Sequence, residues 1–146
     1  TLKCYMADTG LLVSHAFDAH GNVPIEVYQK LILGKLEMNE GMMVENIVAQ
    51  MLVASGHRLY FYSDPDRKKK ENRMEIDFLI AKSKLTNRHN ISPIEVKSGK
   101  RYALTSLEKC IRKYHDYLAT PYVTHTDDVM LSGGIVYIPL YMVPLL

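Results

Sequence analysis

The sequence predicts an α/β fold in which a mixed central sheet is flanked by helices. Two observations support this prediction. Apolar residues recur three and four positions apart in residues 42–54 and again after Thr105, which is typical of helices packed on a core. Between these segments lie three short runs of apolar, aromatic and β-branched residues, which are typical of strands. The expected order is therefore a helix, three strands, a helix and two further strands.

The first part of the chain is expected to lead into this core. Residues 5–13 are apolar but are interrupted at residues 8–10, which we interpret as a turn. Residues 25–36 have helical spacing. The helix predicted for residues 42–54 ends at Ser55-Gly56, because glycine adopts the left-handed conformation that often closes a helix.

Strands and one more helix follow. The predicted strands are residues 58–63, 74–81, 93–97, 122–125 and 135–142, and the predicted helix is residues 105–118. Thr105 and Glu108 have the spacing of a capping box at the start of that helix. We expect a single domain over residues 1–146, with a lead-in segment and helix in 1–40 and an αβββαβ-type core plus a C-terminal strand in 41–146.

Composition narrows the class of protein. The 146 residues are 47% apolar and 23% charged, which is ordinary for one globular domain. The formal net charge of +2 is too small to predict nucleic-acid binding by itself. Two cysteines, Cys4 and Cys110, supply no disulfide framework, so we expect a cytoplasmic location. The apolar tail, residues 134–146, is too short to span a bilayer, so we expect no membrane partner. Because the chain opens on Thr1 rather than on Met, we expect a piece excised from a longer protein.

Charged residues lie on two neighbouring predicted strands. Glu95 and Lys97 are two positions apart, so they project from the same face. Asp77 lies among apolar residues, and Leu79 is expected to share its face, which favours an enclosed side. Glu45 lies above the apolar stripe of the helix predicted for residues 42–54.

Each of these residues has an ordinary explanation when it is taken alone. Glu45 and Asp77 could be solvated acids, and Glu95 with Lys97 could be a structural ion pair. Together they suit a metal site, because Mg²⁺ or Mn²⁺ prefers carboxylate oxygens. Lys97 could then steady an attacking water or the charge that develops on phosphorus.

Basic residues near this site could contact phosphate groups. Arg67, Lys68 and Lys69 lie in a polar loop, whereas Lys100 and Arg101 directly follow the strand that contains Glu95. Charged loops are usually just solvated, so we favour Lys100 and Arg101 as contacts to a nucleic-acid backbone. The six histidines are scattered without metal-ligand spacing, and zinc is not expected.

Asp77 followed by Glu95-Val96-Lys97, with Glu45 on a preceding helix, resembles the PD-(D/E)XK nuclease superfamily, which has the restriction-endonuclease-like fold. The resemblance implies metal ligands at Asp77 and Glu95, an accessory acid at Glu45, a catalytic lysine at Lys97 and a Mg²⁺ or Mn²⁺ cofactor. The proline of the superfamily's name is absent before Asp77.

Segments along the whole chain are also similar to a domain of unknown function that follows the ATPase module in prokaryotic AAA-type ATP-binding proteins. These segments are residues 5–12, 41–46, 75–80, 93–99 and 138–142. The resemblance implies that an N-terminal AAA-type ATPase domain of the same full-length protein is the partner. The chain itself has no Gly-rich loop ending in Lys-Ser or Lys-Thr, so we expect no ATP hydrolysis from it.

Two functions of different classes remain open at this point. One is a Mg²⁺-dependent nuclease-like domain that acts on DNA, which the presence of Glu45, Asp77, Glu95 and Lys97 together favours. The other is a catalytically inactive module that binds nucleic acid or protein and couples it to the ATPase. A homodimer formed through the apolar tail, residues 135–146, is a further possibility.

Overall fold

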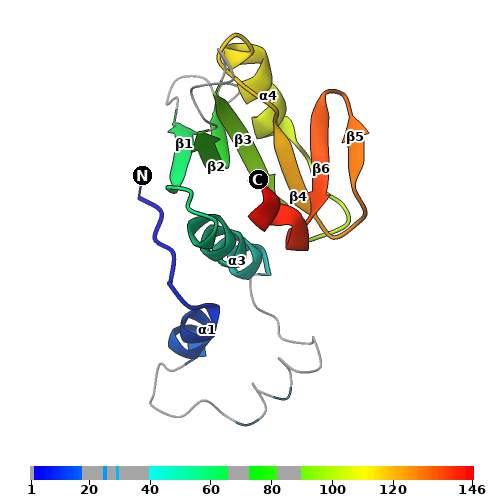
Figure 1. Cartoon of the computed structure of the whole chain (residues 1–146). Helices are drawn as coiled ribbons and strands as arrows, with labels where there is room; N and C mark the ends of the chain where they lie inside the picture. The colour runs from blue at the N-terminus through cyan, green and yellow to red at the C-terminus, as the bar shows by residue number, and fades with distance from the viewer. Residues whose placement is uncertain (1, 18–24, 26–28, 30–39, 66–72, 82–89) are drawn as a thin grey trace.

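The computed structural model describes residues 2–17, 25, 29, 40–65, 73–81 and 90–146. Within these ranges a mixed sheet is flanked by helices (Figure 1). The mixed α/β fold predicted from the sequence is therefore confirmed. The elements are α1 (Thr9–Phe17), α3 (Glu40–Ala54), β1 (Tyr60–Asp64), β2 (Met74–Ala81), β3 (Ile91–Val96), α4 (Thr105–Tyr114), β4 (Tyr122–His125), β5 (Met130–Ser132), β6 (Ile135–Pro139) and the 3₁₀ helix η2 (Leu140–Leu145).

The described sheet has six strands in the order β1-β2-β3-β4-β6-β5. β1, β2 and β3 pair antiparallel, whereas β3, β4 and β6 run parallel to one another. β5 returns antiparallel to β6 through a tight turn at Gly133 and Gly134, whose φ angles of 57° and 77° suit glycine. The sequence prediction missed β5, and it placed β2 and β4 at their observed bounds.

Two apolar cores cover the two faces of the sheet. One core lies under α3 and η2 and contains Val48, Leu52, Phe78, Ile94 and Val143. The other lies under α4 and is formed by Met74, Ile76, Leu107, Cys110, Val123 and Ile135. Residues that alternate along one strand, such as Tyr122 and Val123, pack in different cores, as the period of a strand requires.

The predicted turn at residues 8–10 is wrong, because α1 begins at Thr9. The Asp8 carboxylate accepts a hydrogen bond from the Leu11 amide at 3.0 Å. Asp8 thereby supplies a partner for an amide of the first turn that would otherwise have none within the helix. The predicted helix at residues 25–36 and the basic residues Arg67, Lys68 and Lys69 lie outside the described part of the chain.

The two ends of α4 differ from the prediction. Leu104 occupies the N-cap position without a side-chain hydrogen bond, so the expected capping box does not form. The helix ends at Tyr114, and Leu118 forms a β-bridge with Ile91 instead of a further helical turn. The predicted last strand is also shorter, because β6 ends at Pro139 and η2 follows.

A β-bulge interrupts the pairing of β1 and β2. Tyr60 pairs with Leu79 and Tyr62 pairs with Ile76, so one residue of β1 lies opposite two residues of β2 between these pairs. The first of those two residues is Asp77. Bulges of this kind bend a strand and change the direction of a side chain. This one lies where the sequence places its candidate metal ligand.

Candidate functional site

The Asp77 carboxylate lies where β2 and β3 stop pairing. The paired residues closest to it are Phe78 and Ile94. One residue beyond Glu95, the amide of Val96 donates a hydrogen bond to Asp77 Oδ2 at 2.9 Å. A side-chain carboxylate thus continues the connection between the two strands where the ladder ends.

The bulge also decides which face Asp77 belongs to. Ile76 and Leu79 pack in the core under α4, whereas Phe78 packs in the core under α3. The alternation of the strand is therefore reversed at the bulge, and Asp77 contacts Lys3 rather than the neighbours of Leu79. The expectation that Leu79 shares the face of Asp77 is wrong, because a bulge breaks the period of two.

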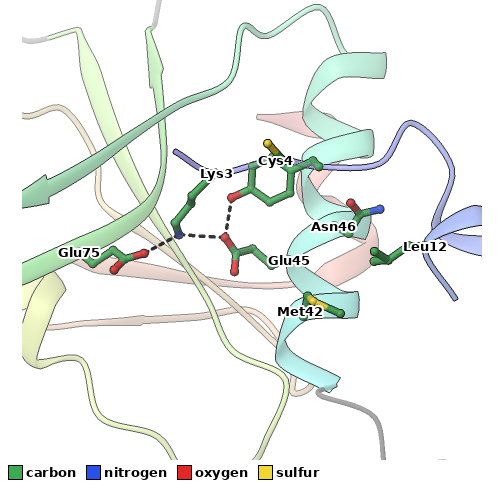
Figure 2. Close-up of a pocket in the computed structure, with 8 residues that line it drawn as sticks. Lys3, Cys4, Leu12, Met42, Glu45, Asn46 and Glu75 are labelled. Carbon is green, nitrogen blue, oxygen red and sulfur yellow. Dashed lines mark hydrogen bonds and ion pairs between the residues drawn. The ribbon is translucent and has the colours of Figure 1, made fainter. Parts of the chain in front are cut away.

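Lys3 lies at the centre of an acidic cluster on this side of the sheet. We call Lys3, Glu45, Glu75 and Asp77 the Lys3 cluster. The Lys3 ammonium is 2.9 Å from Glu45 Oε1, 3.0 Å from Glu75 Oε1 and 3.2 Å from Asp77 Oδ1. Figure 2 shows the Lys3 side chain between Glu45 on α3 and Glu75 on β2. The sequence analysis identified Glu45 and Asp77 but missed Lys3 and Glu75.

The segment that carries Lys3 is tied to α3. The Met6 amide donates to Asn46 Oδ1 at 2.8 Å, and Asn46 Nδ2 donates to the Met6 carbonyl at 3.2 Å. Asn46 is 2% exposed and also donates to Thr9 Oγ1 at 3.0 Å, so its buried amide is satisfied. Nearby, the Tyr5 hydroxyl donates to Glu45 Oε1 at 2.5 Å.

The contacts in the Lys3 cluster change its proton affinities. Burial by itself lowers the pKa of Lys3, but hydrogen bonds to Glu45 and Glu75 and the charge of Asp77 outweigh it and raise the pKa. Burial and the hydrogen bond to Glu45 raise the pKa of Tyr5. Lys3 is therefore a cation, and Tyr5 a hydroxyl donor, throughout the physiological pH range.

Glu95 and Lys97 form a separate pair. Lys97 Nζ donates to Glu95 Oε1 at 2.8 Å. Glu95 is 7% exposed, and within the described residues its other oxygen, Oε2, is buried without a hydrogen-bond partner. Ile94 and Val96 pack toward α3, so alternation directs Glu95 to the other face.

Both acids of the predicted metal pair hold protons more tightly than in water. Burial and the charge of Asp77 raise the pKa of Glu95 to about 7, although Lys97 opposes this. Burial also raises the pKa of Asp77; the Val96 amide lowers it, and the charge of Glu45 raises it. Burial is the main cause of both shifts, and the nearby charges of Glu45 and Asp77 add to it.

A count of formal charges shows an excess of negative charge around these residues. Glu45, Glu75, Asp77 and Glu95 contribute four negative charges when they are ionised, and their two ammonium partners contribute two positive charges. The remaining charge of −2 is equal in size to the charge of one divalent cation.

Residues 40–143 match the family described as "Domain of unknown function (DUF4143)". The chain belongs to this family. No curated protein and no solved structure matches it. The matched range of this DUF4143 domain begins at Glu40 with α3 and contains Glu45, Glu75, Asp77, Glu95 and Lys97, whereas Lys3 precedes it.

The donor atoms of this DUF4143 domain fit a hard divalent cation in part. Carboxylate oxygens are the ligands that such a cation prefers, and the buried Glu95 Oε2 lacks a partner within the described residues. These acids do not form a complete metal site, because no three His, Cys, Asp or Glu residues in the described ranges are grouped to hold a metal ion. The structure joins Glu45 to Asp77 through Lys3, and Glu95 to Lys97, but it does not unite the three predicted ligands.

A pocket of about 240 Å³ adjoins the Lys3 cluster of the DUF4143 domain (Figure 2). Lys3, Glu45, Glu75 and Leu12 are among the residues that line it. The cluster is therefore bordered by open space on the side of α1 and α3.

The predicted phosphate contacts of the DUF4143 domain have only a partial structural description. Lys100 and Arg101 are exposed and lie shortly after β3. The Glu95–Lys97 pair lies at the end of the same strand. Their role as contacts to the nucleic-acid backbone stays a prediction.

Within the described residues, no helix is both long and apolar enough to cross a membrane.

Proposed function

We propose that this domain is a divalent-cation-dependent nuclease-like domain of the restriction-endonuclease-like fold that acts on DNA. It would form the C-terminal part of a cytoplasmic AAA-type ATPase. The main support is the position of Asp77. Its carboxylate lies where two antiparallel strands separate. One of its oxygens accepts a hydrogen bond from the Val96 amide, and the other contacts the Lys3 ammonium. The Glu95–Lys97 pair lies on the adjoining strand.

Each residue has a distinct part in this proposal. Asp77 and Glu95 would hold Mg²⁺ or Mn²⁺, with Glu45 as an accessory acid. When bound, the cation would polarise the scissile phosphate and lower the pKa of an attacking water. Lys97 would release its contact with Glu95 and stabilise negative charge on the phosphate. Lys100 and Arg101, both exposed, would position the DNA backbone.

A Mn²⁺ titration by calorimetry tests the metal site directly. The wild-type domain should bind Mn²⁺, and Asp77→Asn should lose that binding because it removes a charged ligand without changing the size of the side chain. Asp116→Asn is the matched control, since Asp116 has a 74% exposed side chain that pairs only with His115 among the contacts described. Failure of the wild-type domain to bind Mn²⁺ at millimolar concentration contradicts the proposal.

Cleavage of labelled single- and double-stranded DNA with and without EDTA then tests the activity. Metal binding with no cleavage of either substrate would contradict the catalytic part of the proposal and retain the metal site.

A second candidate is a catalytically inactive module that binds nucleic acid or the ATPase domain. One observation favours it: the position between Glu45 and Asp77 is filled by the Lys3 ammonium. A structural network of this kind needs no metal. DNA binding that is unchanged by EDTA and by Asp77→Asn would favour this second function over the first.

A further inference from the structure

We propose that Lys3 is an internal cation that closes the Lys3 cluster, and that a divalent cation enters only when the Lys3 ammonium moves out. The inference rests on the proposed metal site and adds its regulation. Lys3 lies outside the range matched to the family, so nothing in that match assigns it a part.

The contacts of Lys3 are those of a bound cation. Its ammonium is within 3.2 Å of one oxygen from each of three carboxylates, which come from α3 and β2. An ammonium has three donors and no acceptor, so three acids use its whole capacity. Two of the oxygens that it contacts, Glu45 Oε1 and Asp77 Oδ1, belong to predicted metal ligands.

Lys3 and a divalent cation cannot share these oxygens without a large repulsion. Mg²⁺ binds carboxylate oxygens at about 2.0–2.1 Å. A cation on the oxygen that Lys3 contacts at 2.9 Å would therefore lie within a few ångström of the ammonium. Repulsion between two cations so close together is strong in a partly buried site. Occupancy by one thus opposes occupancy by the other.

The Lys3 side chain can leave without unfolding the segment that carries it. The backbone is held independently by the pair of hydrogen bonds between Met6 and Asn46. The Lys3 side chain is 14% exposed and borders the pocket of about 240 Å³. A lysine has a flexible four-carbon stem, so its ammonium can swing into this space while the main chain stays in place.

The neighbouring acid still attracts a cation when Lys3 is in place. Glu95 is 93% buried, and its Oε2 has no partner within the described residues. The cluster and the Glu95–Lys97 pair together retain the formal charge of −2 counted above. Lys3 therefore neutralises only part of the negative charge near the point where β2 and β3 separate.

A Mn²⁺ titration of Lys3→Met tests the competition. Removal of the competing charge should tighten Mn²⁺ binding roughly tenfold or more. Lys113→Met is the matched control and should bind as the wild type does, because Lys113 pairs with Asp64 at 2.9 Å outside the cluster. Equal or weaker binding by Lys3→Met, with a wild type that binds, overturns the inference and leaves the metal site intact. If no variant binds Mn²⁺, the proposed function fails and the inference fails with it.

A second measurement uses the wild-type chain, in case Lys3→Met does not fold. Reductive methylation followed by mass spectrometry reports how accessible each lysine amine is. Lys3 should react slowly without metal and several-fold faster at saturating Mn²⁺, whereas the rate at Lys113 should not change. Mn²⁺ binding, shown by calorimetry, without a faster reaction at Lys3 overturns the inference.

Discussion

Substitution of Glu95 by glutamine is expected to remove most of the pH dependence of the domain's stability near neutral pH. Burial and the charge of Asp77 raise the pKa of Glu95 from its ordinary value of 4.5 to about 7. A carboxyl group whose pKa is raised by folding stabilises the fold when it is protonated. Its contribution is therefore complete below about pH 4.5 and is lost as the pH rises through about 7.

The size of the effect follows from the same two pKa values. They differ by about 2.5 pKa units, and one unit corresponds to about 1.4 kcal/mol, which gives about 3 kcal/mol as an upper figure. The side chain is only 9% exposed, so solvent screens it little. Glutamine keeps the shape, stays uncharged and can still accept the hydrogen bond from Lys97. Glu95→Gln should therefore be more stable than the wild type at about pH 8 by up to about 3 kcal/mol.

Urea unfolding in the absence of divalent cations, at about pH 5, 6, 7 and 8, measures this difference. The free energy of unfolding of the wild type should fall over this range, and the fall should be much smaller in Glu95→Gln. A small remaining slope is expected from Asp77, whose pKa is also raised by burial. Glu108→Gln is the control, since Glu108 is an exposed acid on α4. A wild-type stability that rises over this range, or a variant with an unchanged slope, would refute the reasoning.

Three further outcomes are expected. Asn46→Leu should destabilise the domain by about 2 kcal/mol and speed hydrogen exchange in α1, because the buried amide at Asn46 holds the N-terminal segment; unchanged exchange would contradict this. Gly134→Ala should lower the free energy of unfolding in urea by about 1 kcal/mol, because φ at Gly134 is 77°. Gly99→Ala should lower it less, because Gly99 has no positive φ; both positions have open space for a Cβ. A thiol reagent should modify the exposed Cys4 rapidly and Cys110 only on unfolding, since Cys110 is 2% exposed and burial raises its thiol pKa.

Much of the fold was predictable because local pattern reports local burial. The short strand-like runs at residues 74–81 and 122–125 reproduce the bounds of β2 and β4. Helical spacing likewise predicted α3 to within two residues of its observed start. β5 was missed because three exposed residues carry no burial pattern, although the paired glycines after it indicate a hairpin turn.

The candidate site was predictable only in part. Glu95 and Lys97 form the pair that their spacing predicts, because residues two apart on a strand share a face. The same rule failed for Asp77 and Leu79, since it assumes a regular strand and β2 contains a bulge. The bulge is specified by pairing with β1, which the pattern within β2 does not show.

The sequence by itself determined most elements of the α/β fold, although not α1 or β5, and it identified four of the charged residues near the site. It did so because side-chain burial repeats with the period of each element. Only the tertiary structure brought Lys3 to Glu45 and Asp77, which lie 42 and 74 residues away in the chain. Such contacts depend on the path of the whole backbone and leave no local periodic signal. The fold therefore decided that the Lys3 ammonium lies among the acids of the cluster.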